Sequence, residues 1–376
     1  LRVNGIVQGV GFRPFIWRLA TELKLTGRVY NDAGGVIIEL NCNEMQAGEF
    51  AEIMSQQLPP LARIDAMHHE PVDLPFFSSF EIDVSQSGTV TTGCAPDAAT
   101  CPDCLTELRQ PSDRRYQYPF INCTNCGPRL SIIRQIPYDR ASTTMAEFTL
   151  CAACQQEYDN PADRRFHAQP NACPDCGPSY WLETPDGETL ASETPFQALG
   201  EALRDGLIVA IKGIGGVHLA CDATNEQAVK RLRERKQRSH KALALMAANI
   251  EAIRQFARVN EQDEALLAHP AAPVVLLSTH EKTDQLRAIA PSVAPDNSKI
   301  GVMLPYSPVH HLLLAEVDFP LVMTSGNRSG EPQAITNDAA RSQLNGIADL
   351  LLLHNRPIHN RLDDSVVVAG KHGTQI

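Results

Sequence analysis

The chain has 376 residues, of which 43% are hydrophobic and 20% are charged, and its formal net charge is −11 at pH 7. This length exceeds what one ordinary hydrophobic core supports, so two or three domains are expected. The acidic balance argues against a protein that coats nucleic acid, and no apolar run approaches the roughly 18 residues of a membrane span. The sequence opens at Leu1, not at a methionine, without a signal peptide, and it ends soon after an apolar run. We therefore expect a piece of a longer protein, with a further domain beyond its carboxyl end.

The first 85 residues or so alternate between extended and helical patterns. Segments typical of strands are 1–7, 27–31, 35–41, 62–72 and 78–85, and apolar spacing predicts helices over 14–25 and 44–58. The order strand, helix, strand, strand, helix, strand is that of a ferredoxin-like sandwich. We place this first domain at residues 1–88.

The segment GIVQGVGFRPF, residues 5–15, ends the first strand in a bend that carries one charge. Gly9 and Gly11 tolerate positive φ, so the backbone N–H groups of residues 8–12 can point into one concavity. Arg13 would add a guanidinium and make a pocket for a small dianion such as phosphate. The alternative is a plain strand-to-helix turn, with Pro14 at the first helical position and Arg13 in solvent.

Asn31 ends the second strand of this domain. A helix joins the first two strands, so they should run parallel and end at the same sheet edge. The Asn31 amide could then lie near the bend and orient a water molecule. An acyl phosphate is already activated, so positioning and charge neutralisation can suffice for its hydrolysis. Alternatively, Asn31 is a turn-former in NDAGG.

Residues 86–100 are predicted to be a linker, and a cysteine-rich segment follows, with its domain placed at 89–186. Eight of the 11 cysteines form CxxC pairs inside two copies of one unit, 101–132 and 151–182. Four thiolates suit tetrahedral zinc, and the repeat favours two structural sites. The expected ligands are Cys101, Cys104, Cys123 and Cys126 for one zinc and Cys151, Cys154, Cys173 and Cys176 for the other. Interleaved pairing of the CxxC turns and redox-active dithiols are the alternatives. Cys42, Cys94 and Cys221 are expected to be plain thiols.

Residues 187–376 have the pattern of a mixed α/β domain. Helices are predicted over 196–207 and 225–237, and buried strands over 208–213, 242–247, 273–278, 301–305, 321–327 and 349–355. Seven basic residues crowd the end of the second helix: Lys230, Arg231, Arg233, Arg235, Lys236, Arg238 and Lys241. Such a run is either a solvated helix face or, where the helix stops, a site for a polyphosphate. GIGG at 213–216 lacks the GK[ST] ending of a P-loop.

These motifs together resemble a known family. GIVQGVGFRPF followed by Asn31 is similar to the acylphosphatase signature, and this resemblance implies phosphate binding by Arg13 and the backbone of Gln8, Gly9, Val10, Gly11 and Phe12. The duplicated cysteine unit, AIKGIGGVHLACDA, RERKQRSHKALALM and TSGNRSGEP resemble the hydrogenase maturation carbamoyltransferases of the HypF family over the entire chain. The resemblance implies a YrdC-like last domain whose nucleotide site comprises Lys236, Arg238, Lys241, Thr324, Ser325, Asn327, Asp364 and Ser365. Ala242 departs from the proline that relatives often carry, which puts the rigidity of that loop in doubt. His218 either faces the site or is a core histidine.

The resemblance also implies a reaction sequence and a cytoplasmic location. Carbamoyl phosphate is hydrolysed to carbamate and phosphate, and carbamate with ATP and Mg²⁺ then forms carbamoyl adenylate. In intact members a further domain transfers the carbamoyl group to the carboxyl-terminal cysteine of the partner protein HypE. Two rival functions are a threonylcarbamoyl-adenylate synthase for tRNA modification, which leaves the first 180 or so residues unexplained, and a non-enzymatic zinc-binding adaptor. The adaptor is disfavoured because only 6% of the residues are aromatic.

Overall fold

The computed structural model describes residues 1–86, 93–192, 194–280, 289–370 and 373–375. The predicted linker, 86–100, lies partly outside them. The chain divides into two compact units. Unit 1 comprises residues 1–97 and 121–177, and unit 2 comprises residues 98–120 and 178–376.

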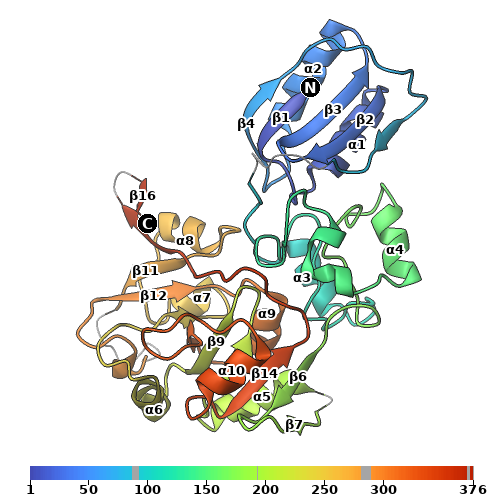
Figure 1. Ribbon diagram of the computed structural model, residues 1–376. Helices are drawn as coiled ribbons and strands as arrows, with labels where there is room; N and C mark the ends of the chain where they lie inside the picture. Colours follow the sequence, from blue (N-terminus) through green and yellow to red (C-terminus); the bar gives the residue numbers. More distant parts are fainter. Residues whose placement is uncertain (87–92, 193, 281–288, 371–372, 376) are drawn as a thin grey trace. The chain divides into compact units, whose positions relative to one another are not determined.

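Unit 1 contains a five-stranded sheet with the strand order β4-β1-β3-β2-β5 (Figure 1). The elements are β1 Arg2–Ile6, α1 Phe12–Glu22, β2 Thr26–Asp32, β3 Gly35–Asn41, α2 Glu44–Gln56, β4 Arg63–His68 and β5 Phe80–Ile82. Both β1 and β2 pair antiparallel with β3, so they run parallel to each other as predicted. The ferredoxin-like order is confirmed, with β5 as an added edge strand parallel to β2.

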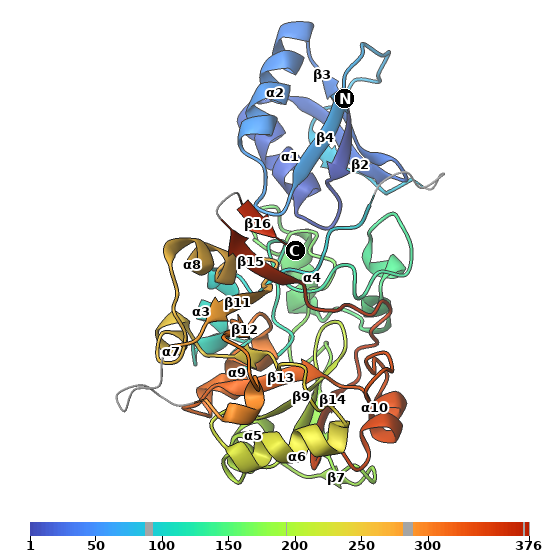
Figure 2. The same cartoon turned by 90° about the vertical axis from the view of Figure 1, so that its left-hand side faces the viewer.

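Helices α1 and α2 lie on one face of this sheet (Figure 2). Their buried side chains, including Ile16 and Phe50, join strand residues such as Val29 and Ile38 in one apolar cluster. Because α1 follows β1 after a short bend, this packing fixes the bend against the sheet edge.

Residues 121–177 of unit 1 contain little regular structure. They hold two short 3₁₀ turns, Arg140–Ser142 and Thr144–Glu147, and the helix α4, Ala152–Asp159. Among the described residues, none of the three apolar core clusters includes a residue of this segment, which is the setting in which bound metal supplies the stability of a fold.

Unit 2 is built on an 11-stranded mixed sheet with the order β16-β15-β11-β12-β10-β13-β9-β8-β14-β6-β7. The strands are β6 Tyr180–Glu183, β7 Thr189–Leu190, β8 Val209–Lys212, β9 Val217–Asp222, β10 Leu245–Met246, β11 Val274–Ser278, β12 Lys299–Met303, β13 Leu321–Ser325, β14 Leu350–His354, β15 Val366–Gly370 and β16 Gly373–Gln375. The helices are α3 Pro102–Arg109, α5 Pro195–Arg204, α6 Glu226–Lys236, α7 Ile250–Ile253, α8 Glu261–Leu267, α9 Pro308–Ala315 and α10 Asn337–Leu344, with a 3₁₀ turn at Pro291–Val293.

Two apolar clusters cover the two faces of this sheet. Consecutive β9 residues divide between them, since Leu219 belongs to one cluster and Ala220 to the other. Helices α6 and α10 pack in the first cluster, and α5 and α9 pack in the second. The strand β9 lies near the middle of the sheet, yet the sequence patterns above do not predict it.

Within the described residues, no helix has both the length and the apolar character that crossing a bilayer requires.

Candidate functional site

The bend after β1 adopts the predicted glycine conformations. Gly9 has φ 74° and Gly11 has φ 73°, and Gly11 is the N-cap of α1, which begins at Phe12. Among the described residues, no backbone N–H group of residues 8–12 donates a hydrogen bond. These open donors stand at the N-terminus of a helix, where an anion is favoured. Pro14 is the third residue of α1, so its expected place at the first helical position is wrong.

Arg13 is buried, with 8% of its surface exposed, so it does not extend into solvent. Its Nη2 donates to Asp139 Oδ1 at 2.8 Å, and its Nη1 donates to Ser85 Oγ at 3.2 Å. With the Asn31 amide oriented so that its oxygen faces the guanidinium, that oxygen accepts from Nε and Nη2 of Arg13 at 3.3 Å each. The structure therefore brings the two predicted catalytic residues together.

The second part of unit 1 forms a wall over this bend. The Tyr138 backbone N–H donates to Gln8 Oε1 at 3.1 Å, and Arg129 Nε donates to the Gly9 carbonyl at 2.7 Å. A Cβ on Gly11 would lie 3.0 Å from Cβ of Thr124, so the wall approaches closely where glycine leaves room. Gln8 thus contributes its side chain to holding the wall, a role that the sequence did not indicate.

The resulting pocket is lined by residues from both parts of unit 1: Val7, Gly9, Gly11, Phe12, Arg13, Pro14, Asn31, Cys123, Thr124, Arg129, Tyr138, His167, Ala168, Gln169 and Pro170. Burial and then the charge of Arg13 lower the pKa of His167 to about 4, so its imidazole is neutral at physiological pH. The pocket can hold a small anion against one guanidinium with little competition from solvent.

The eight CxxC cysteines gather in two groups. The metal-ligand atoms within each group lie within 4.8 Å of one another, in the sets Cys101, Cys104, Cys123, Cys126 and Cys151, Cys154, Cys173, Cys176. Zinc–sulfur bonds of about 2.3 Å in a tetrahedron place sulfurs about 3.8 Å apart. The sulfurs of Cys151 and Cys173 are 3.7 Å apart, and those of Cys173 and Cys176 are 3.8 Å apart. The geometry fits zinc in the consecutive pairing that the repeat predicts.

The second cysteine group is tied to the pocket wall. Arg140 Nη1 donates to the carbonyls of Gln169 at 2.6 Å and Asn171 at 2.9 Å. Asn171 Nδ2 in turn donates to the Cys154 carbonyl at 3.1 Å. The fold around this group and the position of Gln169 in the wall are therefore coupled.

The remaining cysteines, Cys42, Cys94 and Cys221, form no disulfide within the described residues. Burial raises the pKa of both Cys94 and Cys221 to about 12, so neither thiol is activated as a nucleophile.

In unit 2 the basic run is divided, because Lys230 and Lys241 are exposed whereas Arg233 and Lys236 are buried. Arg233 donates to five backbone carbonyls, and Arg235 pairs with Asp349 at 2.7 Å. Lys236 Nζ donates to the Ser325 carbonyl at 2.5 Å and to the Asn327 carbonyl and Oδ1 at 2.7 Å each. Burial and then Arg238 lower the pKa of Lys236 to about 8. These side chains hold the end of α6 and the 324–327 loop in place.

The other predicted nucleotide residues are distributed around this loop. Thr324 is buried in β13, and Ser325 Oγ donates to Asn327 Oδ1 at 2.7 Å. Arg238 lies beyond the end of α6 and donates to the carbonyl of Ala242 at 2.9 Å. Asp364 Oδ2 lies 3.5 Å from Nε2 of His218, and the Ser365 carbonyl accepts from Val274. Lys241 is exposed.

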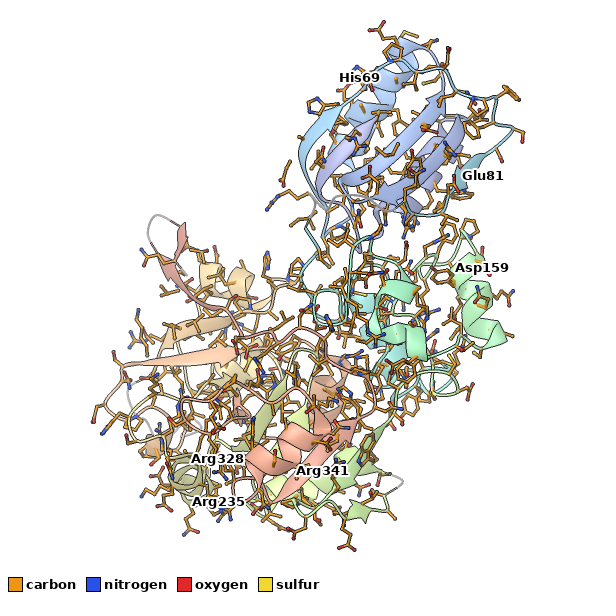
Figure 3. The ribbon with its side chains drawn as sticks, viewed as in Figure 1. His69, Glu81, Asp159, Arg235, Arg328 and Arg341 are labelled. Carbon is orange, nitrogen blue, oxygen red and sulfur yellow. The ribbon has the colours of Figure 1, made fainter. Side chains whose placement is uncertain are left out.

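A cavity of about 380 Å³ opens beside the predicted loop. Its lining includes Arg235, Lys236 and Arg328, and Arg235 and Arg328 are labelled in Figure 3. The predicted residues Arg238 and Lys241 do not line it.

Known protein families match the same three parts of the chain. Family models match residues 1–82 as acylphosphatase, residues 100–133 and 150–183 as the HypF finger, and residues 201–376 as the family described as telomere recombination. The chain is 51% identical over 373 residues to the carbamoyltransferase HypF of Rhodobacter capsulatus and 50% identical over 376 residues to that of a Synechocystis strain. These matches cover 98% and 99% of this chain and 48% of each relative. Nearly the whole chain is therefore similar to HypF carbamoyltransferases. It spans about half the length of these relatives.

A solved structure shows the same fold. A crystal structure of full-length HypF in the phosphate- and nucleotide-bound form superposes with a TM-score of 0.95 at 44% identity, over 100% of this chain and 49% of that one. The first domain alone is 41% identical over 83 residues to an acylphosphatase of Caldivirga maquilingensis, of which the match covers 86%. The similarity to HypF thus agrees with the three predicted folds.

Sequence reasoning did not identify the pocket wall. Thr124, His167 and Gln169 lie in the segments matched as the HypF finger, and Asp139 lies between those segments. No local motif marks these residues as neighbours of the first domain. The available signal was a motif that both copies of the cysteine unit share, P-x-D-R-R followed by an aromatic residue, at 111–116 and 161–166. His167 directly follows the second copy of this motif.

Proposed function

We propose that this chain carries the first two steps of carbamoyl transfer, with domains at 1–88, 89–186 and 187–376. The observation that carries the proposal is the convergence of Arg13 and Asn31 beneath a loop of open N–H groups. Carbamoyl phosphate is the substrate of the first step, and zinc in the two cysteine groups has a structural role.

In the first step the phosphoryl group of carbamoyl phosphate binds the N–H groups of residues 8–12 and the Arg13 guanidinium. Asn31 orients a water molecule, whose oxygen attacks phosphorus while the bond from phosphorus to the carbamoyl oxygen breaks. Carbamate leaves as a stable anion, so no strong base is needed, and the fixed positive charge offsets the charge that develops on phosphorus.

In the second step a carbamate oxygen attacks the α-phosphorus of ATP, supplied with Mg²⁺, and pyrophosphate leaves. The loop held by Lys236, with Thr324, Ser325 and Asn327, and residues Arg238, Lys241, Asp364 and Ser365 are the proposed nucleotide contacts. Transfer to HypE would need the part of the family's length that this chain does not span. A cytoplasmic location completes the proposal and suits cysteines that form no disulfide within the described residues.

Two assays on the zinc-loaded chain test the proposal. Phosphate should be released from carbamoyl phosphate, and Arg13→Ala should lower that rate by at least about a hundredfold, as loss of a charge-stabilising donor does. Pyrophosphate should exchange into ATP only when carbamoyl phosphate is supplied. Exchange that depends on threonine and bicarbonate instead would overturn the assignment in favour of a threonylcarbamoyl-adenylate synthase.

A further inference from the structure

Arg129 joins two parts of unit 1: the bend at residues 8–12, which we call the anion loop, and the CxxC turn at 123–126. Only 1% of its surface is exposed, and it lines the same pocket as Arg13. Its Nε donates to the Gly9 carbonyl at 2.7 Å. Its Nη1 and Nη2 donate to four further carbonyls, those of Cys123, Thr124, Cys126 and Pro128. These bonds engage all five N–H groups of the guanidinium, so Arg129 has none left to donate to an anion.

The cysteine turn by itself does not account for this arginine. The first copy of the repeat reads CTNCGPR and the second reads CPDCGPS, so Ser179 occupies the position that matches Arg129. Ser179 is exposed, and the Cys173 carbonyl in that copy accepts from the Gly177 N–H at 2.8 Å. A CxxCGP turn therefore forms without an arginine at this position. What sets Arg129 apart is its bond to Gly9 in the anion loop.

That bond fixes the peptide group between Gly9 and Val10. In a trans peptide the carbonyl and the N–H point in opposite directions, so a Gly9 oxygen held by Arg129 turns the Val10 N–H away from Arg129. Among the described residues, nothing else bonds to this oxygen or to this N–H. Gly9 has φ 74° and lacks a Cβ, so little else resists rotation of the peptide. An anion facing a rotated peptide would lose one N–H donor and meet a carbonyl oxygen instead.

We propose that Arg129 is a positioning residue that keeps the Val10 N–H directed at the phosphoryl group bound in the anion loop. For the identity of the substrate, carbamoyl phosphate, this inference rests on the proposed function, whereas the positioning role itself extends to any phosphate that the loop binds. Arg13 contacts the anion, and Arg129 acts through the Gly9 peptide. The cysteine-rich segment thus sets the conformation of the phosphate site as well as covering it.

Arg129→Met tests this role, because methionine fills part of the same buried space and donates no hydrogen bond. Isothermal titration of the zinc-loaded variant with inorganic phosphate should give a Kd at least about tenfold higher than that of the wild type. In ¹H–¹⁵N spectra of the wild type, phosphate should shift the Val10 amide resonance. In Arg129→Met that shift should be lost, while the Phe12 amide, at the start of α1, should still shift. A purely structural role predicts that both shifts change together, and that outcome would overturn the inference.

Two variants separate orientation from charge and from folding. Arg129→Lys keeps the charge, but its single nitrogen cannot bond to Gly9 and to the cysteine turn in the fixed fork that arginine provides. It should therefore bind phosphate more weakly than the wild type while it retains two zinc ions per chain, and wild-type affinity would overturn the orientation role. This variant decides alone if Arg129→Met loses zinc. Arg134→Met removes a positive charge from an exposed ion pair in the same segment and should leave the Kd for phosphate unchanged. An equal loss of affinity there would assign the effect to net charge and refute the inference.

Inorganic phosphate keeps this inference separate from the proposed reaction. A Val10 shift that depends on Arg129, in a wild type that releases no phosphate from carbamoyl phosphate, would support the positioning role and refute the first step. Turnover of carbamoyl phosphate together with equal Val10 shifts in the wild type and in Arg129→Met would refute the positioning role and leave the first step standing. A Val10 resonance that does not move in the wild type at saturating phosphate would also refute it.

Discussion

The Asp139 carboxylate forms an ion pair with the Arg13 guanidinium, so it competes for Arg13 with any anion that enters the pocket. Asp139 Oδ1 lies 2.8 Å from Arg13 Nη2. The Asp139 side chain is 34% exposed and the Arg13 side chain is 9% exposed. A phosphate that binds Arg13 must displace this carboxylate or accept a like charge beside it. Asp139→Asn removes the charge, keeps the shape and should strengthen phosphate binding.

The magnitude follows from the exposure of the pair. Hydrogen bonds to charged groups contribute about 1.5–3 kcal/mol when buried, whereas exposed ion pairs contribute about 0–1 kcal/mol. Since one partner is buried and the other is half-buried, we expect about 1 kcal/mol, which is about fivefold in Kd. Isothermal titration of the zinc-loaded chain with inorganic phosphate measures this, and the KM for carbamoyl phosphate should fall by a similar factor.

Glu147→Gln is the matched control, because Glu147 pairs with Arg134 in the same segment, where both side chains are exposed. It should leave the Kd for phosphate unchanged. If Asp139→Asn weakens phosphate binding, Asp139 instead holds Arg13 in its productive orientation, and the reasoning from competition is refuted.

Two more perturbations test the metal sites and unit 2. Cys173→Ser should lower the zinc content from two ions to one per chain, and it should weaken phosphate binding because the second cysteine group is coupled to Gln169 in the pocket wall. The control Cys42→Ser should retain both ions. Two zinc ions per chain in Cys173→Ser would contradict the ligand assignment. Burial lowers the pKa of Lys212 to about 8, and its Nζ contacts Asn337 Oδ1 and the His354 carbonyl without an ion-pair partner among the described residues. The unfolded chain therefore binds more protons between about pH 8 and 10.5, so the free energy of unfolding should rise with pH there, by up to about 3 kcal/mol from Lys212. Urea unfolding followed by Trp181 fluorescence in a Trp17→Phe background should show a smaller rise in Lys212→Met, and an identical rise would refute this account.

Local patterns predicted the parts of the site that lie close together in sequence or on one sheet edge. Gly9 and Gly11 fixed the conformation of the bend, and the parallel strands β1 and β2 placed Asn31 beside Arg13. The spacing of the CxxC turns predicted which cysteines gather, because a repeat carries its pairing with it.

Contacts over long sequence separations could not be predicted in the same way. Asp139 follows Arg13 by 126 residues, and nothing in the sequence around it indicates an ion pair. The strand β9 was missed because His218 and Asp222 interrupt its apolar run, although every residue of the strand is buried. Arg233 lies in the predicted helix, yet it bonds to backbone carbonyls, which charge patterning alone does not indicate.

The path of the chain between the two units limits how the protein can be divided. The polypeptide leaves unit 1 after residue 97, returns to it at residue 121 and leaves again after residue 177. A gene fragment that stops after the first strands and helices would therefore encode Arg13 and Asn31 without Asp139, Tyr138 or Gln169. Such a product would present an uncovered anion loop to solvent, and its selectivity among acyl phosphates would differ from that of the longer chain.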